Sequence, residues 1–416
     1  MKRKKIIRKI EVCAPAGSWE SLAAAIKAGA DSIYFGAGKL NMRSHSSANF
    51  AKDDIFRISE KCHRAGVYSY LALNSIIYDE DIENAVAFCD CAKNAGISAV
   101  IVSDFSMLEY AKSISIPAHV SVQMNVSNFK SLKSLAKFAD VFVLARELNL
   151  NQITKIAKLI HEEKIISPSG LPPRIELFVH GALCMAVSGT CGMSLASYGK
   201  SAFRGECYQN CRRRYRVFDD ETGQEYVLDN GYVMSPKDLC CIRILDRIIE
   251  SGVSILKIEG RGRSPDYVYE TAKTYCEARD MVLEGRFKDD LAKELEKRLE
   301  SVFNRGFWKG GYYLGDRSGE WSGISGGRNE KKKIFAGRVT NYFQKAKCAE
   351  LSLEAEGINL EDELLATGAT TGVLKFKVSS LKSNRLSVKS AKKGTVVTLT
   401  IPEKVRRGDK VYVLRG

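Results

Sequence analysis

The sequence has no long apolar run. Across its 416 residues, no stretch approaches the roughly 20 consecutive apolar residues that a membrane helix needs. The amino terminus, MKRKKIIRKIEV, is charged and lacks the apolar core of a secretory signal peptide. We therefore expect a cytoplasmic protein without a membrane partner, in which cysteine thiols stay reduced rather than forming disulfides.

Histidine-based protease motifs are also missing. The sequence contains no H-E-x-x-H and no convincing Cys-His-Asn set, and it has only five histidines. His180 and Cys184 are four residues apart and would suit a base and a nucleophile, but a ligand role for Cys184 explains the same residues. A peptidase stays open as an alternative, without a histidine-based motif to support it.

The chain has fewer acidic than basic residues. The chain has 64 Lys and Arg against 49 Asp and Glu, a net charge of +15, and the segment from Lys331 to Gly416 holds 18 basic and eight acidic residues, or +10. Concentrated positive charge is typical of proteins that bind a phosphate backbone. A solvated basic surface accounts for it equally well.

Short apolar runs alternate with amphipathic stretches through the first three quarters of the chain. Runs that are apolar on both faces and separated by helices indicate a parallel sheet covered by helices, and eight of them predict a (β/α)8 TIM-like barrel. Glycines that follow the helical patterns fit helix ends before the next strand. The predicted strands are Ile10–Ala14, Ser32–Phe35, Tyr68–Ala72, Ala99–Val102, His119–Val122, Val141–Leu144, Ile175–Val179 and Ile255–Ile258.

The pattern changes near residue 330. We predict a barrel domain over 1–310 with a cysteine-bearing insertion at 180–235 after strand seven, a linker at 311–332, and a small basic β-barrel over 333–416. Residues 264–304 are expected to form two further helices. The other helical patterns are Trp19–Ala28, Lys52–Ala65, Ile82–Ala95, Phe129–Phe138, Leu150–His161 and Lys237–Ser251, and the strands of the last domain are Phe335–Val339, Cys348–Leu353, Asp362–Leu365, Val373–Val378, Val396–Ile401 and Lys410–Leu414.

Four cysteines in the insertion have the spacing C-x6-C-x15-C-x3-C: Cys184, Cys191, Cys207 and Cys211. Structural zinc sites favour short C-x2-4-C pairs, which only the last two approach, whereas a 4Fe–4S cluster accepts thiolates spread over loops. Spacing alone favours the iron–sulfur interpretation over zinc without excluding either. The remaining cysteines fit unligated core positions: Cys13, Cys62, Cys89, Cys91, Cys240, Cys241, Cys276 and Cys348.

The string ELFVHGALCMAVSGTC, residues 176–191, resembles the signature of the U32 "collagenase-like" peptidase family. Further family-like motifs follow in order at Cys13–Gly17, Ser121–Asn125, Ala145–Leu148, Lys237–Leu239 and Lys257–Arg261, so the resemblance covers the whole barrel domain. It implies relatives that act as oxygen-independent hydroxylation factors for the tRNA wobble uridine (with prephenate), for a 23S rRNA cytidine and for the ubiquinone ring. It also implies that the cysteine quartet holds a 4Fe–4S cluster.

Polar residues cluster just after the predicted strands, where the active face of a barrel lies. Alternation places Lys257, Glu259 and Arg261 on one side, and with His180 the first two are the candidate catalytic residues. Guanidinium groups suit carboxylates such as those of prephenate, and amides suit a base edge or a ring hydroxyl. The candidate substrate-binding residues are Arg43, Asn74, Gln123, Asn125, Arg146, Glu147 and Arg261. A structural ion-pair network and a core histidine explain the same residues without catalysis.

Together, the residues and the resemblance predict an iron–sulfur protein that modifies RNA. The most specific expectation is oxygen-independent, prephenate-dependent hydroxylation of the tRNA wobble uridine to 5-hydroxyuridine, with the basic last domain holding the tRNA and a second family member as a possible partner. Hydroxylation of rRNA or of a quinone precursor, and proteolysis, remain the alternatives.

Overall fold

A computed structural model describes residues 10–45, 49–226, 231–315, 320–324, 326–329 and 331–416. The predicted insertion and linker each contain residues outside these ranges. The described part contains no helix long and apolar enough to cross a membrane.

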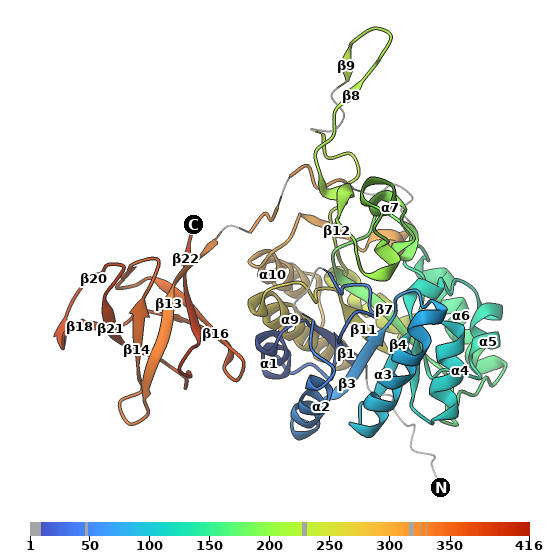
Figure 1. Cartoon of the computed structure of the whole chain (residues 1–416), viewed down its shortest axis with the longest axis horizontal. Helices are drawn as coiled ribbons and strands as arrows, with labels where there is room; N and C mark the ends of the chain where they lie inside the picture. The colour runs from blue at the N-terminus through green and yellow to red at the C-terminus, as the bar shows by residue number, and fades with distance from the viewer. Residues whose placement is uncertain (1–9, 46–48, 227–230, 316–319, 325, 330) are drawn as a thin grey trace.

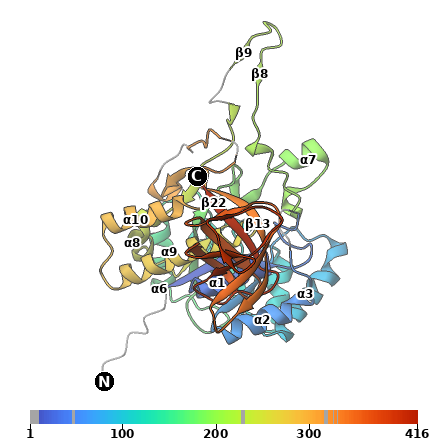
Figure 2. The same cartoon turned by 90° about the vertical axis from the view of Figure 1, so that its left-hand side faces the viewer.

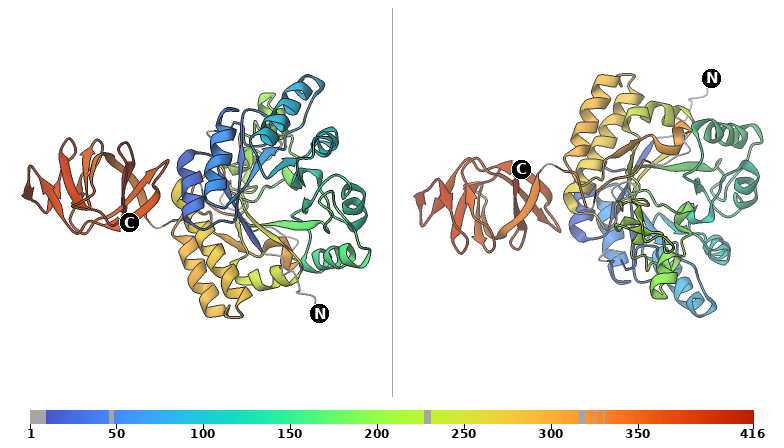
Figure 3. Two further views of the ribbon diagram at one scale, coloured as in Figure 1. Left: turned by 90° about the horizontal axis from the view of Figure 1, so that it is seen from below. Right: turned by 90° about the horizontal axis from the view of Figure 1, so that it is seen from above.

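A closed ring of eight parallel strands forms the first domain, and Figure 3 shows it nearly end-on. Seven strands follow one another in space as they do in sequence, and the pairing of β7 with β11 closes the ring. The predicted (β/α)8 barrel is confirmed, and each predicted strand overlaps an observed one. The strands are β1 Glu11–Ala16, β2 Ser32–Gly36, β3 Tyr68–Leu73, β4 Ala99–Val102, β5 Ala118–Val120, β6 Val141–Val143, β7 Arg174–Gly181 and β11 Ile255–Ile258.

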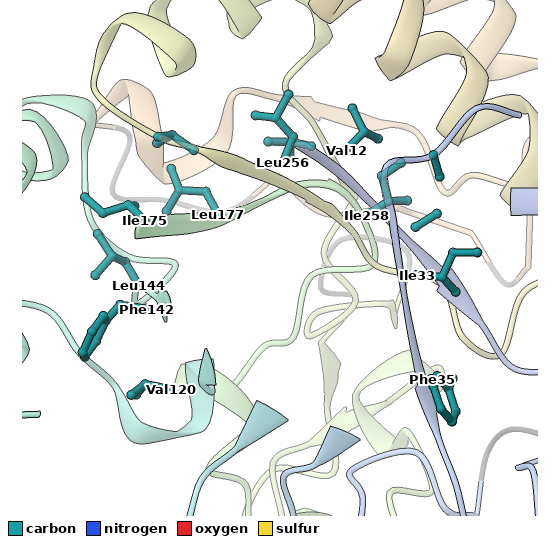
Figure 4. Packing of buried hydrophobic residues seen from close by; sticks show 14 of the residues in the cluster. Val12, Ile33, Phe35, Val120, Phe142, Leu144, Ile175, Leu177, Leu256 and Ile258 are labelled. Atoms are coloured by element: carbon teal, nitrogen blue, oxygen red, sulfur yellow. The ribbon is translucent and has the colours of Figure 1, made fainter. Parts of the chain in front are cut away.

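Side chains of these strands alternate between two apolar layers. Val12, Ile33 and Leu256 face outward into the large core between barrel and helices, part of which Figure 4 shows, whereas Cys13 and Tyr34 face the barrel interior. The helices that cover the ring are α1 Trp19–Lys27, α2 Asp54–Arg64, α3 Ile82–Asn94, α4 Phe105–Ser113, α5 Phe129–Leu135, α6 Leu150–Glu162, α8 Leu245–Glu250, α9 Pro265–Leu283 and α10 Asp289–Glu300.

Several helices begin at a side-chain cap that the sequence supplies. Ser18 accepts a hydrogen bond from the Ser21 amide at 3.1 Å, and Asn149 and Gln152 form a reciprocal capping box at the start of α6. These caps hold the first turns of helices whose apolar faces the barrel then buries.

The prediction of one helix over Lys237–Ser251 is wrong in its first half. Asp238–Cys240 form strand β10, which pairs antiparallel with the end of β7 and parallel with β12, Phe307–Lys309. Because β7 is eight residues long, its last residues extend past their barrel neighbours and offer free backbone groups, and this long-range pairing overrides the local helical pattern.

The barrel domain also continues past residue 310, where we placed the start of the linker. Gly311–Leu314 form a short 3-10 turn, and the buried Tyr313 donates a hydrogen bond to the Phe178 carbonyl at 2.8 Å. The aromatic residues of this segment therefore close the barrel wall beside β7.

The second domain is an antiparallel sheet rolled around its own core (Figures 1 and 2). All six predicted strands are present, and the short ones were missed because two or three residues carry little periodic signal. The strands are β13 Lys332–Phe343, β14 Cys348–Leu353, β15 Ile358–Asn359, β16 Glu363–Gly368, β17 Gly372–Lys377, β18 Leu381–Ser383, β19 Leu386–Ser387, β20 Ser390–Ala391, β21 Val396–Thr400 and β22 Lys410–Arg415.

A small apolar contact joins the two domains. Ala24 of α1 packs with Leu365 and Val373 of the second domain, and the Lys27 ammonium donates to the Val373 carbonyl at 2.9 Å. The second domain therefore lies beside α1, on the flank of the barrel (Figure 1).

The insertion after β7 covers one end of the barrel. It contains the short helix α7, Met193–Tyr198, and a projecting hairpin of β8, Val217–Phe218, and β9, Glu225–Tyr226 (Figure 1). Because it follows the carboxyl end of β7, it lies over the end of the barrel where active sites are found.

Candidate cysteine-lined active site

A cavity of about 490 Å³ lies between the carboxyl ends of the barrel strands and the insertion. Its floor consists of inward-facing side chains from separate strands: Tyr34, Ile101, Val143, Phe178 and Lys257. Its roof is the insertion itself, including all four cysteines of the predicted quartet. A site with strand residues below and loop residues above matches the usual placement of barrel chemistry.

The four cysteines line this one cavity as free thiols: Cys184, Cys191, Cys207 and Cys211. Burial raises the pKa of the Cys211 thiol; the Arg212 charge opposes this, and the three other sulfurs add to it. The other eight cysteines lie outside the cavity. Among the described residues, no three His, Cys, Asp or Glu side chains form a group that could hold a single metal ion.

The loops that carry the cysteines have an unusual backbone. Ser188 and Gln209 both adopt positive φ, at 46° and 53°, which is uncommon outside glycine and is often found at functional sites. Within the described chain, the buried Ser188 hydroxyl and the buried Asn210 side-chain oxygen have no hydrogen-bond partner, although both residues line the cavity. Buried polar atoms without partners indicate a place where another group binds.

Specific contacts fasten the roof to the barrel. Arg204 pairs with Asp81 at 2.5 Å and lies over the Tyr78 ring, and Arg212 donates to the Leu183 carbonyl at 2.6 Å. Gly205 has a positive φ, and a Cβ there would overlap Ser44, so only glycine permits this close approach. Arg212 therefore braces the cysteine loops from within.

Positive charge dominates the lining. Glu259 is the one carboxylate among the described lining residues, against seven cations: Arg43, Arg146, Arg212, Lys257, Arg261, Arg263 and Arg305. Two of the seven pair with carboxylates that lie outside the cavity lining, Lys257 with Glu176 and Arg305 with Asp238. An enclosed surface with this balance attracts anions.

Glu259 holds one of these arginines in place. It pairs with Arg43 at 2.9 Å; burial alone would raise the pKa of the Glu259 carboxyl, but Arg43, Arg146 and Arg261 outweigh burial and lower it to about 2. Arg261 donates to the Asn41 side chain at 2.9 Å, in the space that Gly36 leaves open. Glu259 is therefore ionised and acts as a counter-ion.

Lys257 has a buried counter-ion that the sequence analysis missed. Its ammonium lies 2.6 Å from Glu176 of β7, and Glu176 also contacts His119 of β5 at 3.1 Å. Burial opposes ionisation of Glu176, but Lys257 and His119 prevail and lower its pKa to about 2. Glu176 is the first residue of the E-L-F-V-H string, and the alternation that placed Lys257 inward also places Glu176 inward.

Arg146 has an unused donor at the cavity wall. Its guanidinium lies over the Phe178 ring at 4.0 Å and donates to the Ala182 carbonyl at 3.3 Å. Its buried Nε has no partner among the described residues. No carboxylate forms an ion pair with Arg146 in the described part of the chain, so it is the lining cation best placed to receive an anionic ligand.

The structure brings together most, but not all, of the other predicted site residues. Asn74 and Gln123 line the cavity, and the Asn74 amide donates to Gln123 at 3.0 Å. Asn125 and Glu147 are exposed and lie outside it. Asn125 ends a short 3-10 turn in the left-handed conformation.

His180 lies outside the cavity, contrary to its predicted role as the acid–base residue. Lys257 pairs with Phe178 and Ile258 with His180, so Val179 is an extra residue that shifts the register. The bulge turns His180 outward against Tyr275 and Phe307. Burial, and then the Arg263 charge, lower its pKa to about 3, so it is a neutral core histidine.

A model of peptidase family U32 matches residues 17–323. The chain belongs to this family. A collagenase of Porphyromonas gingivalis is 45% identical over 406 residues, covering 98% of each protein. A 23S rRNA 5-hydroxycytidine synthase of Escherichia coli is 33% identical over 323 residues, covering 75% of this chain and 46% of that protein. A tRNA hydroxylation protein of Bacillus subtilis is 29% identical over 307 residues, covering 72% of this chain and 70% of that protein.

The family match shows which part of this chain is common to U32 proteins. The family match begins just after β1, spans the rest of the barrel and the cysteine insertion, and ends before the second domain begins. The names of the relatives cover both proteolysis and RNA hydroxylation, so the geometry of the cavity has to decide between them for this chain.

Removing one partner of the buried Glu176–Lys257 ion pair should strongly destabilise the barrel. We expect Glu176→Gln to lower the free energy of unfolding by about 3–5 kcal/mol at pH 7, because it leaves a buried ammonium without its counter-ion. Glu176→Leu combined with Lys257→Met should recover most of the loss. Because folding lowers the pKa of the Glu176 carboxyl, the stability difference between the unmodified chain and Glu176→Gln should persist at every pH above the ordinary carboxyl pKa. It should shrink as the pH falls toward about 2. Denaturant titrations across pH test this, and equal losses in the single and double variants would contradict it.

The buried His180 should make folding sensitive to moderate acid. Between pH 6.5 and about 3, the unfolded chain binds a proton at His180 that the folded chain does not. The free energy of unfolding should therefore decrease by roughly 2–3 kcal/mol when the pH is lowered from 7 to 4.5. His180→Gln should remove that part of the slope. Comparing the two pH values within each variant cancels any constant loss of packing, and an unchanged slope would show that His180 is protonated in the fold.

Proposed function

We propose that this U32 chain hydroxylates a pyrimidine of RNA, and most specifically the wobble uridine of tRNA, to 5-hydroxyuridine, with prephenate as co-substrate and without O2. One observation carries the proposal: four cysteines and a cationic wall converge on one cavity at the carboxyl end of the barrel. The names of two relatives, which refer to rRNA hydroxycytidine synthesis and tRNA hydroxylation, support RNA as the substrate.

A 4Fe–4S cluster suits the residues that face this cavity. A 4Fe–4S cluster accepts four thiolates that are spread over loops, and the four cysteines line one cavity. Cys184, Cys191, Cys207 and Cys211 would hold it. The surplus of lining cations would offset the negative charge of four thiolates. When bound, the cluster supplies one-electron redox chemistry.

The cationic wall would bind the co-substrate. Prephenate carries two carboxylates, and guanidinium groups bind carboxylates through paired, charge-assisted hydrogen bonds. Arg146 has the unused Nε, Arg261 is held by a neutral amide, and Lys257 lies on the floor between them. Glu259 fixes Arg43, whose amide donates to the same Asn41 side-chain oxygen as Arg261, so the wall is rigid before any ligand arrives.

The polar edge formed by Asn74 and Gln123 would orient the base. Their amides already bond to each other and to Ser121, which fixes the direction of the remaining donors and acceptors. Replacing the hydrogen on carbon 5 by hydroxyl removes two electrons from the base, so the reaction needs an oxidant beyond the side chains of the cavity.

The second domain would hold the RNA backbone. Residues 364–402 contain seven Lys and Arg and no Asp or Glu. Five of them lie exposed around β18 to β21 and form no ion pair within the described chain: Lys382, Arg385, Lys389, Lys392 and Lys393. Unpaired cations on one edge suit phosphate groups, and binding through them weakens steeply with salt.

Proteolysis is the second candidate, because a 45% identical relative is named a collagenase. The cavity offers no histidine to activate one of its thiols, since the described lining residues include none. Hydroxylation of rRNA, or of a quinone precursor, would use the same cavity residues.

Nucleoside analysis tests the proposal directly. We expect tRNA from cells without the gene, and from cells carrying Cys191→Ala, to lose 5-hydroxyuridine, because that variant removes one of the four proposed cluster ligands. Cys348→Ala, which alters a partly buried cysteine of the second domain, should leave the nucleoside at its normal level. Mass spectrometry of digested tRNA and rRNA measures the 5-hydroxyuridine level in each of these strains. Unchanged nucleosides in the deletion strain would refute RNA hydroxylation and direct the search to quinones and peptides.

Arg146 should govern co-substrate affinity. We expect Arg146→Gln to raise the apparent KM for prephenate about 10- to 100-fold, because a charge-assisted hydrogen bond contributes about 1.5–3 kcal/mol. Arg146→Lys should recover part of the loss. The exposed Arg247→Gln, on α8, is the matched control and should have no effect. Equal KM values for Arg146→Gln and Arg247→Gln would exclude Arg146 as an anchor.

A further inference from the structure

A row of three rings and one guanidinium lies beside the cavity, on the insertion and on the loop after β2. The His45 and Tyr208 rings are 5.0 Å apart, Tyr208 and Tyr198 are 4.9 Å apart, and the Arg213 guanidinium lies 5.4 Å from the Tyr198 ring. Arg213 also donates a hydrogen bond to the Tyr198 hydroxyl. The row therefore joins the loop after β2, the helix α7 and the segment that follows the last cysteine.

This aromatic row is exposed and yet fixed. Tyr198 is 43% exposed and Tyr208 37%, and His45 and Arg213 are exposed as well. The Tyr208 amide donates to the Ser194 hydroxyl at 3.0 Å, and the His45 amide donates to the Gly205 carbonyl at 3.2 Å. Rings that stay in place while facing solvent lose little conformational entropy when a ligand stacks on them.

The aromatic row lies at the edge of the cavity. Tyr208 is bracketed by Cys207 and Gln209, which both line the cavity, and Ser194 lines it too. Other large apolar side chains of the same insertion are exposed too, with Met185 at 48%, Val187 at 53% and Leu195 at 55%. Apolar side chains gathered on one exposed segment indicate a binding surface.

We propose that the aromatic row of His45, Tyr208, Tyr198 and Arg213 is a stacking platform for an unpaired nucleobase of the RNA substrate, next to the base that enters the cavity. Proteins read single-stranded RNA by stacking splayed bases on aromatic rings and on arginine planes. A base in an unpaired loop that stacks here would present its neighbour to the cavity mouth.

The chemistry of the aromatic row favours RNA over a peptide. The row ends in a guanidinium and contains no carboxylate, so it suits a partner with flat rings and negative charge. The inference rests on the proposed RNA substrate and adds to it a preference for unpaired over paired RNA.

Binding measurements on two RNAs test the platform. The probes are a labelled RNA hairpin with an unpaired uridine-containing loop and a fully paired duplex of the same composition. Tyr208→Ala and Tyr198→Ala should each weaken binding of the hairpin about 5- to 100-fold, in line with the loss of one stacked base. Tyr208→Phe and Tyr198→Phe should bind like the unmodified chain, because they keep the ring.

Salt dependence separates stacking from phosphate binding. The alanine variants should keep the slope of binding against salt and leave the duplex unaffected. The double variant Lys392→Gln and Lys393→Gln, on the second domain, should instead reduce the slope for both RNAs. Far-UV circular dichroism and iron content, matched to the unmodified chain, exclude misfolding of the insertion.

The outcomes distinguish this proposal from the proposed function. Alanine variants that bind the hairpin normally would overturn the stacking platform, while loss of 5-hydroxyuridine in Cys191→Ala would still support the proposed function. An unmodified chain that binds neither RNA would overturn both. Equal weakening for hairpin and duplex would also overturn the platform, because stacking requires an unpaired base.

Discussion

One extra residue in strand β7 sets the geometry on which the site depends. Val179 bulges opposite Lys257 and Ile258, so Phe178 faces the cavity and His180 faces the outer core. The Val179 carbonyl accepts hydrogen bonds from the Tyr275 hydroxyl at 2.9 Å and from the Cys241 amide at 3.0 Å, which fixes the bulge from two elements. Beyond it, Gly181 turns with φ of 106° against the Glu259 carbonyl and directs the chain over the barrel mouth. Cys184 lies in the cavity because of this path.

Charge imposes the second constraint. The described lining of the barrel mouth has seven cations and one carboxylate, so the cations repel one another unless an anion binds. The deeper carboxylates Glu176 and Asp238 offset part of this repulsion. The remaining positive charge is available to bind anionic ligands. Four thiolates together with a dicarboxylate would supply that charge, whereas a neutral peptide would not. The same cavity therefore argues for anionic ligands more strongly than the collagenase name of a relative argues for proteolysis.

Much of the architecture follows from sequence periodicity. Eight strands that are apolar on both faces, with helical patterns between them, can be recognised without a structure, and Ala99–Val102 and Ile255–Ile258 match residue for residue. The cysteine quartet, Arg43, Arg146, Lys257, Glu259 and Arg261 could also be placed near the mouth, because polar residues after parallel strands converge. Features that depend on the register between strands could not be predicted from the sequence. The bulge that moves His180 and the pairing of β10 with β7 arise from contacts between distant segments. Arg305 enters the site for the same reason, since its neighbours in the sequence give no sign of the cavity.

The most direct test of the account is the metal content of the chain purified without oxygen, together with its electron paramagnetic resonance spectrum after reduction. The account predicts a brown protein with about four iron and four sulfide per chain and the signal of a reduced 4Fe–4S cluster, all lost in Cys184→Ser, Cys191→Ser, Cys207→Ser and Cys211→Ser. A colourless protein that holds one zinc per chain on the same cysteines, or no metal at all, would contradict it.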